Sequence, residues 1–324
     1  MRAAWYERNG TARDVLTVGT LPDPIPGPGE VRVRIEASGV NPSDVKSRAG
    51  RPLAGARVVP HSDGAGTIDS IGDGVPLERL GERVWIWNGQ WKRPFGTAAE
   101  YCVLPADQAV FLPGQTSFAE GACLGIPALT ALRALTVDGG VVGKTVLVAG
   151  GAGAVGTYAI QFARLLGAAE VISTVSSAQK AVLAASFGAD YVINYRDEPV
   201  VDRLRDITGG RGVDRVVEVD AAANASLWPG VIRQDGLAVI YGSGKPQVSV
   251  DFLPMIMSGM ALRFFIVYEL APEVRRELVQ SLNGYLSAGL LTHHVAETFP
   301  LGKIADAHEA VEGGKVTGNV VIDF

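Results

Sequence analysis

The N-terminal part of the chain contains short runs in which apolar and polar residues alternate. In residues 31–36, Val-Arg-Val-Arg-Ile-Glu, every second side chain is apolar, which is typical of a half-buried strand. Prolines at every second position from Pro22 to Pro28 exclude a helix before it. Residues 84–87 and 101–104 predict two more strands. We therefore expect residues 1–121 to form an antiparallel, barrel-like β domain.

The pattern changes after about residue 120. Apolar strand candidates then alternate with segments of helix length, and residues 157–166 are apolar almost all round, as in a helix buried against a sheet. Six strands with intervening helices predict an α/β domain, residues 122–267, built on a doubly wound parallel sheet. The six candidates are residues 146–149, 171–174, 191–193, 216–219, 238–241 and 263–267.

The C-terminal residues return to a mixed pattern. Residues 273–286 predict a helix and residues 320–322 predict a strand. We expect this tail, residues 268–324, to complete the first domain. An apolar terminal strand at 263–267 would be prone to aggregation if its edge were bare, and pairing across a twofold axis would cover it. The pattern thus predicts a homodimer.

A glycine-rich segment follows the strand predicted at 146–149. Gly151, Gly153 and Gly156 form G-x-G-x-x-G between a strand and a helix, the context that indicates a dinucleotide site. The first glycine permits a tight turn, the second lets a pyrophosphate approach, and the third lets helix and strand pack. Helix N–H groups then face the anion. The alternative is a glycine-rich turn without a ligand. The predicted pyrophosphate-binding residues are Gly151, Ala152, Gly153, Ala154, Val155 and Gly156.

The segment about 20 residues further on bears on the choice of cofactor. NAD-specific sites place Asp or Glu there to bind the ribose hydroxyls. This chain has Thr174, Ser176, Ser177 and Lys180 instead, and hydroxyls with an amine suit a 2′-phosphate. The segment predicts NADPH as the cofactor; the alternative is that Lys180 is an ordinary solvated helix residue.

Composition agrees with a globular protein of two domains. The 324 residues are 47% hydrophobic and 19% charged, and the length is too great for a single small core. The formal net charge is −5, without a run of Lys and Arg. The sequence therefore offers no electrostatic reason to expect a nucleic-acid partner.

The number of cysteines and the length of the apolar segments indicate where in the cell the protein is expected to be. Cys102 and Cys123 are the only cysteines, too few for a disulfide framework or a four-cysteine metal site; we expect both to be buried and unreactive. No window approaches the roughly 20 apolar residues of a membrane span, and the N-terminus has no signal-peptide pattern. The sequence predicts a cytoplasmic protein without a membrane partner.

Several motifs in order along nearly the whole chain resemble those of the quinone oxidoreductase and zeta-crystallin branch of the medium-chain dehydrogenases/reductases. This resemblance is more specific than G-x-G-x-x-G alone. It rests on Gly-Val-Asn-Pro-Ser-Asp at 39–44, Gly-Asp-Gly-Val at 72–75, Gly-Glu-Arg-Val at 81–84, Ala-Glu-Tyr at 99–101, Gly-Ile-Pro-Ala-Leu-Thr-Ala at 125–131 and Thr-Gly-Asn-Val-Val at 317–321.

The resemblance implies a GroES-like β domain, a Rossmann domain and a cofactor in the cleft between them. It implies that Asn41, Asp44 and Thr130 lie near the nicotinamide and its ribose, and that Lys180 and Tyr195 approach the 2′-phosphate. Two residues depart from the family pattern: Lys46 replaces a tyrosine of the substrate pocket, and Asn319 replaces a lysine. The remaining implied cofactor residues are Tyr241, Gly242, Ser243, Phe264, Phe265 and Ile266, with Asn319 in doubt.

The resemblance also bears on zinc. The alcohol dehydrogenases of this superfamily hold catalytic zinc with Cys, His and Cys, and the matching positions here are Asn41, Ser62 and Ile126. None offers a thiolate or an imidazole, and His61 with Asp63 makes only an incomplete site. We therefore expect no metal.

Without a metal, the expected chemistry is hydride transfer from C4 of NADPH to an acceptor that stabilises negative charge, such as a quinone. An alkene or enoyl reductase acting on α,β-unsaturated carbonyls is the alternative in the same chemistry. A noncatalytic NADPH-binding protein, as among the crystallins, is the alternative in another class.

Aromatic residues gather in one stretch of the β domain. Trp85, Trp87, Trp91 and Phe95 could provide an apolar wall for a planar quinone, although core packing is the favoured interpretation for Trp85 and Trp87. Trp91, in a predicted loop, is the better substrate contact. The predicted catalytic residues are Asn41, Asp44, Lys46 and Trp91.

Overall fold

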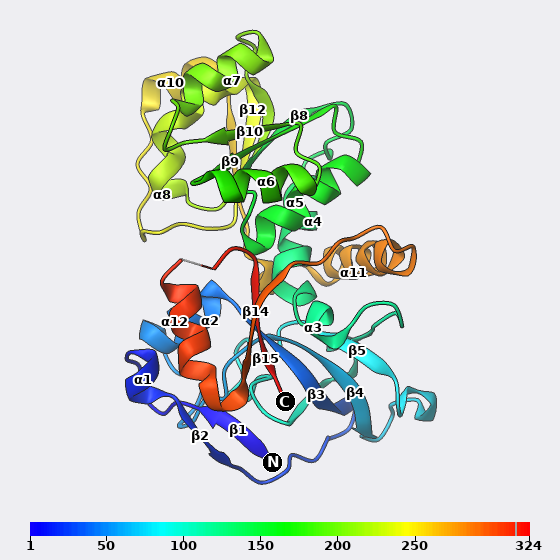
Figure 1. The fold of residues 1–324 in the computed structure, drawn as a ribbon. Coiled ribbons are helices and arrows are strands. Elements are labelled where there is room, and N and C mark those ends of the chain that lie inside the picture. Colours follow the sequence, from blue (N-terminus) through cyan, green and yellow to red (C-terminus); the bar gives the residue numbers. More distant parts are fainter. Residues whose placement is uncertain (315) are drawn as a thin grey trace. The chain divides into compact units, whose positions relative to one another are not determined.

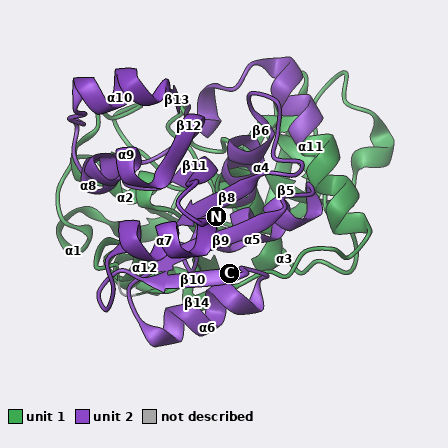
Figure 2. Ribbon diagram, turned by 90° about the horizontal axis from the view of Figure 1, so that it is seen from above, with its two compact units in different colours: residues 1–127, 279–324 green, residues 128–278 purple. Residues whose placement is uncertain are grey.

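The structure, a computed structural model, describes residues 1–314 and 316–324. The chain divides into two compact units, coloured separately in Figure 2. Unit 1 comprises Met1–Pro127 and Val279–Phe324, and unit 2 comprises Ala128–Leu278. Two segments span the boundaries between them, a π-helical turn at Leu124–Ala128 and helix α11 at Pro272–Ser287.

Unit 1 is built on a seven-stranded sheet whose neighbours are antiparallel except for one parallel pair, β14 with β15. A separate antiparallel pair, β1 with β2, lies near the N-terminus. The strands are β1 (Arg2–Trp5), β2 (Thr17–Thr20), β3 (Glu30–Val40), β4 (Asp63–Ile71), β5 (Arg83–Ile86), β6 (Tyr101–Pro105), β7 (Ala109–Phe111), β14 (Val295–Pro300) and β15 (Asn319–Asp323).

Strand β3 organises this sheet. Its alternating residues Val31, Val33 and Ile35 are buried in one core cluster, as the period-two pattern predicts. One edge of β3 pairs with β4. The other edge is divided, because residues 30–34 pair with β6 and residues 37–40 pair with β15. The C-terminal strand thus lies in the same sheet as the N-terminal ones (Figure 1).

The helices of unit 1 are short. Helix α2 matters most for the site, because Asn41 is its N-cap and Pro42 occupies its first turn, where proline is well tolerated. The helices are α1 (Ala12–Val15), α2 (Pro42–Gly50), α3 (Phe118–Gly121) and α12 (Ile304–Glu312).

Unit 2 contains a six-stranded sheet in which every neighbouring pair is parallel, in the order β10-β9-β8-β11-β12-β13. This is the doubly wound arrangement, with the reversal of strand order beside the first strand, β8. The elements are α4 (Leu129–Thr136), β8 (Thr145–Ala149), α5 (Ala154–Leu165), β9 (Glu170–Val175), α6 (Ala178–Ser186), β10 (Tyr191–Asn194), α7 (Val200–Thr208), β11 (Val213–Glu218), α8 (Ala221–Asn224), α9 (Trp228–Val231), β12 (Ile232–Ile240), α10 (Phe252–Ser258) and β13 (Ala261–Phe264).

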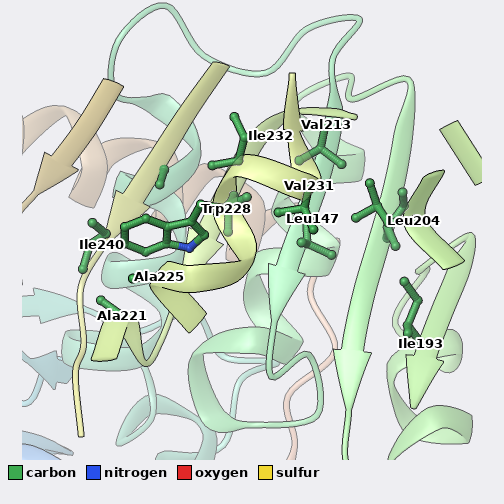
Figure 3. Packing of buried hydrophobic residues seen from close by; sticks show 13 residues of the cluster. Leu147, Ile193, Leu204, Val213, Ala221, Ala225, Trp228, Val231, Ile232 and Ile240 are labelled. Carbon is green, nitrogen blue, oxygen red and sulfur yellow. The ribbon is translucent and has the colours of Figure 1, made fainter. Parts of the chain in front are cut away.

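The core on one face of this sheet is drawn in Figure 3. Trp228 of α9 is buried among residues of β8, β11 and β12, including Leu147, Val213 and Ile240. Its indole Nε1 donates to Glu218 at 3.2 Å, so a large apolar side chain is buried with its polar atom satisfied. On α5, residues 156–163 are buried, as predicted from their nearly uniform apolar character.

Some predicted strand limits were wrong. The strand predicted at 263–267 is Ala261–Phe264, and residues 267–269 form a 3-10 turn in which Val267 is buried. β12 begins at Ile232, six residues before the predicted start, and β11 ends at Glu218. An apolar segment predicts that residues are buried, but it does not predict where the strand ends. The chain can leave the sheet while its residues remain apolar.

Candidate cofactor and catalytic site

The glycine-rich turn connects β8 to α5 in unit 2. Gly150 has a positive φ of 69°, so the left-handed residue of the turn stands one position before Gly151, which was expected to permit the turn. At Gly151 a Cβ would lie 1.9 Å from Ser173 Oγ, and at Gly156 it would lie 2.2 Å from the Gly150 carbonyl oxygen. These two glycines are therefore required by close packing.

Gly153 differs from its neighbours. It is the N-cap of α5 with φ −79°, and a Cβ there would meet only the Gly150 oxygen at 3.3 Å. Its own protein surroundings thus leave almost enough room for a side chain. The first-turn N–H groups of a helix have no partner within the helix, so a bare residue at this cap leaves them accessible to an anion.

Thr174, at the end of β9, supports the turn from the neighbouring strand. Gly150 N donates to Thr174 Oγ1 at 3.3 Å, and Gly151 N donates to the Thr174 carbonyl at 3.2 Å. The predicted cofactor residue Thr174 therefore contacts the glycine turn directly.

The ends of β9 and β10 lie side by side, because Val175 and Asn194 are register partners. Ser176, Ser177 and Lys180 follow β9, and Tyr195 follows β10. Ser177 caps α6, accepting from the backbone N–H of Lys180 at 3.3 Å. Tyr195 is half exposed. The structure thus gathers these four predicted residues at one edge of the sheet.

Arg196 joins this edge as a residue that sequence reasoning missed. Within the described chain, neither Lys180 nor Arg196 forms an ion pair. The nearby carboxylates do have partners: Asp197 accepts from Asn194, and Glu198 lies 3.6 Å from Arg203. The edge therefore presents two unpaired cations, which suit a phosphate.

A cavity of about 530 Å³ opens beside the turn, within unit 2. Gly150, Thr174 and Tyr195 contribute to its wall together with apolar side chains from β8, β11 and the helices α7–α9. Its size is in the range of ligand pockets. The lining residues are Leu147, Ala149, Gly150, Thr174, Tyr195, Glu198, Pro199, Val200, Val201, Val216, Glu218, Val219, Asp220, Ala223, Asn224, Leu227, Trp228 and Val231.

Glu218 is a second residue of this cavity that the sequence did not reveal as special. It is buried, and its carboxylate accepts from Asp220 N at 2.7 Å, Asn224 Nδ2 at 2.9 Å and Trp228 Nε1. Burial, followed by the negative charge of Glu218, raises the pKa of Tyr241. The backbone N–H of Tyr241 donates to the Glu218 carbonyl at 3.2 Å, so Glu218, a residue of the cavity wall, contacts the predicted cofactor residue Tyr241.

The other predicted residues of unit 2 lie at several places. Thr130 is buried in the first turn of α4. A Cβ on Gly242 would lie 2.2 Å from the Val219 oxygen, and Ser243 Oγ donates to the Lys245 carbonyl at 2.7 Å. At the end of β13, Phe264 and Ile266 are exposed and Phe265 is half-buried.

In unit 1, Asn41 and Asp44 form a buried pair at the start of α2. The backbone N–H of Asn41 donates to Asp44 Oδ2 at 2.8 Å. Burial raises the pKa of Asp44 to about 7, opposed by hydrogen bonds from the backbone and side chain of Asn41 and from the backbone of Ser62. A carboxyl group with this pKa can hold or release a proton near neutrality.

The three positions that matched zinc ligands meet around Asp63. Asn41 Nδ2 and the backbone N–H of Ile126 each donate to Asp63 Oδ2 at 3.0 Å. Asp63 is fully buried, and Ser62 precedes it. Sequence reasoning treated Asp63 only as half of an incomplete metal site and missed this contact.

The described residues contain no group of three or more His, Cys, Asp or Glu side chains arranged to hold a metal ion. They also contain no helix with the length and apolar composition needed to cross a membrane.

His61 lies beside this site but takes part in a different network. Its Nδ1 is 2.9 Å from Ser38 Oγ and its Nε2 is 2.9 Å from His308 Nε2, with both rings fully buried. His61 also has a positive φ of 76°, which is uncommon for a non-glycine residue. Ser38 Oγ also lies 2.8 Å from Thr97 Oγ1, which donates to the Asp63 backbone carbonyl, so the His61 network meets the Asp63 backbone but not its carboxyl group.

Lys46, Trp91 and Asn319 have different surroundings. Lys46 is exposed on α2, and Trp91 is half-buried in a turn with Lys92 Nζ 5.9 Å from the ring centroid. Asn319 is buried in β15, where its Nδ2 donates to the His294 carbonyl at 3.1 Å. That hydrogen bond gives Asn319 a structural role and leaves its predicted phosphate contact without geometric support.

The aromatic residues near Trp91 do not form one wall. Trp85 is fully buried and its Nε1 donates to Asn283 Oδ1 at 3.0 Å, which confirms core packing for this residue; Trp87 is half-buried. Phe95 lines a different cavity of about 440 Å³, bounded also by Met1, Leu21 and Tyr101. The favoured interpretation of Trp85 as a core residue therefore holds, and Phe95 lines a cavity whose wall does not include Trp91.

Burial of both cysteines is confirmed. Desolvation raises the pKa of Cys102 to about 11 and raises that of Cys123 as well, which disfavours the reactive thiolate.

Two family models match the chain. The alcohol dehydrogenase GroES-like domain matches residues 27–114, and the zinc-binding dehydrogenase model matches residues 154–283. A curated quinone oxidoreductase from Pseudomonas aeruginosa is 30% identical over 307 residues, covering 92% of each chain.

Solved structures agree with the fold. The Escherichia coli quinone oxidoreductase complexed with NADPH is 27% identical, with a TM-score of 0.90 and full coverage of both chains. An NAD-dependent alcohol dehydrogenase is 30% identical, with a TM-score of 0.91 and the same coverage. The predicted fold class and family are confirmed, and the chain belongs to the quinone oxidoreductase family of the medium-chain dehydrogenases/reductases.

Proposed function

We propose that this protein is an NADPH-dependent oxidoreductase that reduces a quinone without zinc. Bound NADPH supplies a hydride from C4 of its nicotinamide. The observation that carries the proposal is the turn between β8 and α5, which lies beside a 530 Å³ cavity with hydroxyls and unpaired cations at the adjacent strand ends.

The residues of unit 2 fit NADPH. The bare N-cap at Gly153 leaves space for the pyrophosphate, and Ser176, Ser177, Lys180 and Tyr195 suit the 2′-phosphate. The family relatives complexed with NADPH support the same cofactor. Thr130, Tyr241–Ser243 and Phe264–Ile266 remain proposed contacts by family resemblance, whereas Asn319 leaves the proposed set.

Zinc independence is supported by donor chemistry. Zinc in proteins is held by thiolate, imidazole or carboxylate groups. The three aligned positions offer a carboxamide, a hydroxyl and an alkyl group, and the Asn41 amide nitrogen already donates to Asp63. This donor set does not fit catalytic zinc, although one matching family model is described as a zinc-binding dehydrogenase.

Without a Lewis acid, the protein must orient the acceptor and provide a proton. We propose that Asn41 orients the acceptor, and that Lys46 and Trp91 help to orient it by contacting the substrate. Asp44 holds the proton at its carboxyl group, since burial brings its pKa to about 7. Quinones suit such a site because they stabilise the negative charge that the hydride brings.

The assembly proposed for this enzyme is a homodimer. Among the residues that the structure describes, β13 of unit 2 pairs only with β12 and is an outer strand of the sheet. Next to it in sequence, α10 exposes Phe252, Leu253, Ile256 and Met257. Bare strand edges and large exposed apolar groups are typical of interaction surfaces. We also propose a cytoplasmic location, which suits two unpaired buried cysteines.

The function is tested by the loss of NADPH absorbance with metal-free protein, comparing an ortho-quinone with a short enal. Faster quinone turnover is expected. Faster enal turnover would instead identify an alkene reductase, and NADPH binding with no turnover of either would identify a noncatalytic protein. Stimulation by added zinc after chelation would overturn the proposed zinc independence.

A further inference from the structure

Asp63 is buried in unit 1 at a place where the backbone leaves room for a carboxyl group. A Cβ on Gly125 would lie 2.4 Å from Asp63 Oδ1, and a Cβ on Gly39 would lie 3.1 Å from Asp63 Cβ and 2.1 Å from the Ala122 oxygen. Gly125 therefore makes space for the Asp63 carboxyl group and the Ile86 oxygen, whereas Gly39 is required mainly by the Ala122 oxygen. The fold accommodates a buried acidic side chain that the proposed chemistry has not yet used.

The hydrogen bonds of Asp63 determine how the Asn41 carboxamide is turned. Asp63 Oδ2 accepts the backbone N–H of Ile126, which can only donate, so Oδ2 acts as an acceptor. Asn41 must therefore present its NH2 end to Oδ2 at 3.0 Å. Its carbonyl oxygen is the opposite end of the amide and accepts from the Asp44 backbone N–H in the capping box of α2, so Asp63 fixes the NH2 end and the cap fixes the carbonyl end.

The π-helical turn contributes the second donor. Residues 124–128 form this turn, and Ile126 N–H reaches Asp63 from it. π-helical turns are often found at functional sites. The Asn41 side chain is thus held from one direction by its own helix cap and from another by a carboxyl group that the turn fixes.

We propose that Asp63 is a positioning residue for hydride transfer, acting through Asn41 by holding the Asn41 carboxamide in one orientation. This inference rests on the proposed function, because it takes Asn41 to contact the reacting partners. Asp63 itself touches neither cofactor nor substrate in this assignment.

A double-mutant cycle tests the inference, using Asn41→Ala, Asp63→Ala and the double variant. If Asp63 acts through Asn41, each single variant lowers kcat about 10- to 100-fold and the double variant falls no further than the more impaired single one. KM for NADPH stays within about twofold, as expected when only the transition state is affected. Multiplied losses in the double variant would overturn the positioning role.

Thr97→Val is the matched control. Thr97 is equally buried and its Oγ1 donates to the Asp63 backbone carbonyl at 2.5 Å, leaving the Asp63 carboxyl group untouched. Its kcat is expected to remain within about twofold of wild type. A loss as large as that of Asp63→Ala would assign the effect to general destabilisation of the strand.

Asp63→Asn provides a second test if Asp63→Ala does not fold, since it keeps the shape of the side chain. Two measurements on Asp63→Asn are compared: its kcat, and the orientation of the Asn41 carboxamide in its crystal structure, assigned from the hydrogen-bond partners of the two ends of the amide. If the amide keeps its orientation, kcat should be retained; if the amide has turned, kcat should be lost. A mismatch in either direction would overturn the inference. Turnover by the wild-type protein separates the two claims. An inactive wild type would refute both the proposed function and the role of Asp63. An active wild type whose Asn41 and Asp63 variants lose kcat independently would refute only the role of Asp63.

Discussion

Two buried histidines have consequences at the scale of single residues. His61 and His308 face each other through their Nε2 atoms, and His308 Nδ1 has no hydrogen-bond partner in the described structure. Burial lowers the pKa of His61 well below its ordinary value, and the neighbouring His308 lowers it further. Burial also lowers the pKa of His308 to about 3, with a smaller contribution from Arg48. Both rings are therefore neutral in the folded protein at neutral pH.

The stability that these two histidines contribute is expected to fall as pH drops below about 6.5, opposed by Asp44, whose folded pKa of about 7 lies above its unfolded value. In that range the unfolded chain takes up protons at these histidines and the folded chain does not, so each costs up to about 1.4 kcal/mol of unfolding free energy per pH unit. The loss continues until pH approaches the folded pKa, about 3 for His308. Urea unfolding at pH 7, 6 and 5 measures it.

His308→Phe is the variant for that experiment, because it removes one titrating group and its unpaired Nδ1 atom. Its unfolding free energy should depend less steeply on pH than that of wild type between pH 6.5 and 5. An unchanged slope would show that other groups account for the acid sensitivity.

Lys180 gives a prediction about cofactor choice at the same scale. Lys180→Ala is expected to weaken NADPH binding about tenfold or more, because a charge-assisted hydrogen bond contributes about 1.5–3 kcal/mol. NADH binding should change by less than about twofold. Isothermal titration with both cofactors measures the difference, and equal weakening of both would refute the phosphate contact.

Arg205→Ala is the matched control for Lys180→Ala. Arg205 is an exposed cation on α7 in the same unit, away from the ends of β9 and β10. It should bind NADPH as wild type does, so a general effect of removing one positive charge would be visible.

The turn between β8 and α5 shows how one element separates two roles of glycine. Gly156 is required for packing, since its Cβ would overlap the Gly150 oxygen at 2.2 Å. Gly153 has a helix-compatible φ and a much looser contact at 3.3 Å. Packing within the protein explains why Gly156, the third glycine of the motif, is a glycine. It does not explain Gly153, the second glycine, for which we propose the close approach of a ligand as the reason.

The two glycines are therefore expected to respond differently to alanine. Gly153→Ala should unfold within about 1 kcal/mol of wild type yet bind NADPH at least tenfold more weakly, because its methyl group occupies the proposed pyrophosphate approach. Gly156→Ala should lose about 1–3 kcal/mol of unfolding free energy through overpacking. Urea unfolding and NADPH titration of both variants measure this; normal NADPH affinity in Gly153→Ala would refute the turn as the pyrophosphate site.

At the scale of the whole molecule, the exposed apolar side chains of α10 and β13 in unit 2 favour association with a partner. Four large side chains of α10 are 60–76% exposed, and Phe264 at the end of β13 is 60% exposed. A second copy of the chain would cover a strand edge and an apolar helix together.

A mass of twice the chain's 34.0 kDa is therefore expected from size-exclusion chromatography with light scattering. Met257→Glu should shift the protein toward monomer, because it places a charge in the apolar surface, while Val142→Glu, equally exposed in a loop of the same unit, should leave the dimer intact. A wild-type monomer at micromolar concentration would refute the proposed assembly.

Much of the architecture follows from the sequence because it depends on local patterns. Alternation in residues 31–36 predicts β3, the apolar segment 157–166 predicts most of α5, and the glycine spacing predicts the turn. Strand ends were less predictable, since residues 265–267 are as apolar as the strand before them, and only the hydrogen bonds end it at Phe264.

The sequence by itself determined the family, the parallel sheet and the glycine turn, because motif spacing and periodicity are properties of neighbouring residues. Tertiary structure alone decided the contacts between distant ones: Asp63 with Asn41 and Ile126, His61 with His308, and Glu218 with Trp228. A buried polar side chain is stabilised by whichever partner the fold brings to it. Spacing along the chain carries no record of that partner, so these networks appear only once the chain is folded.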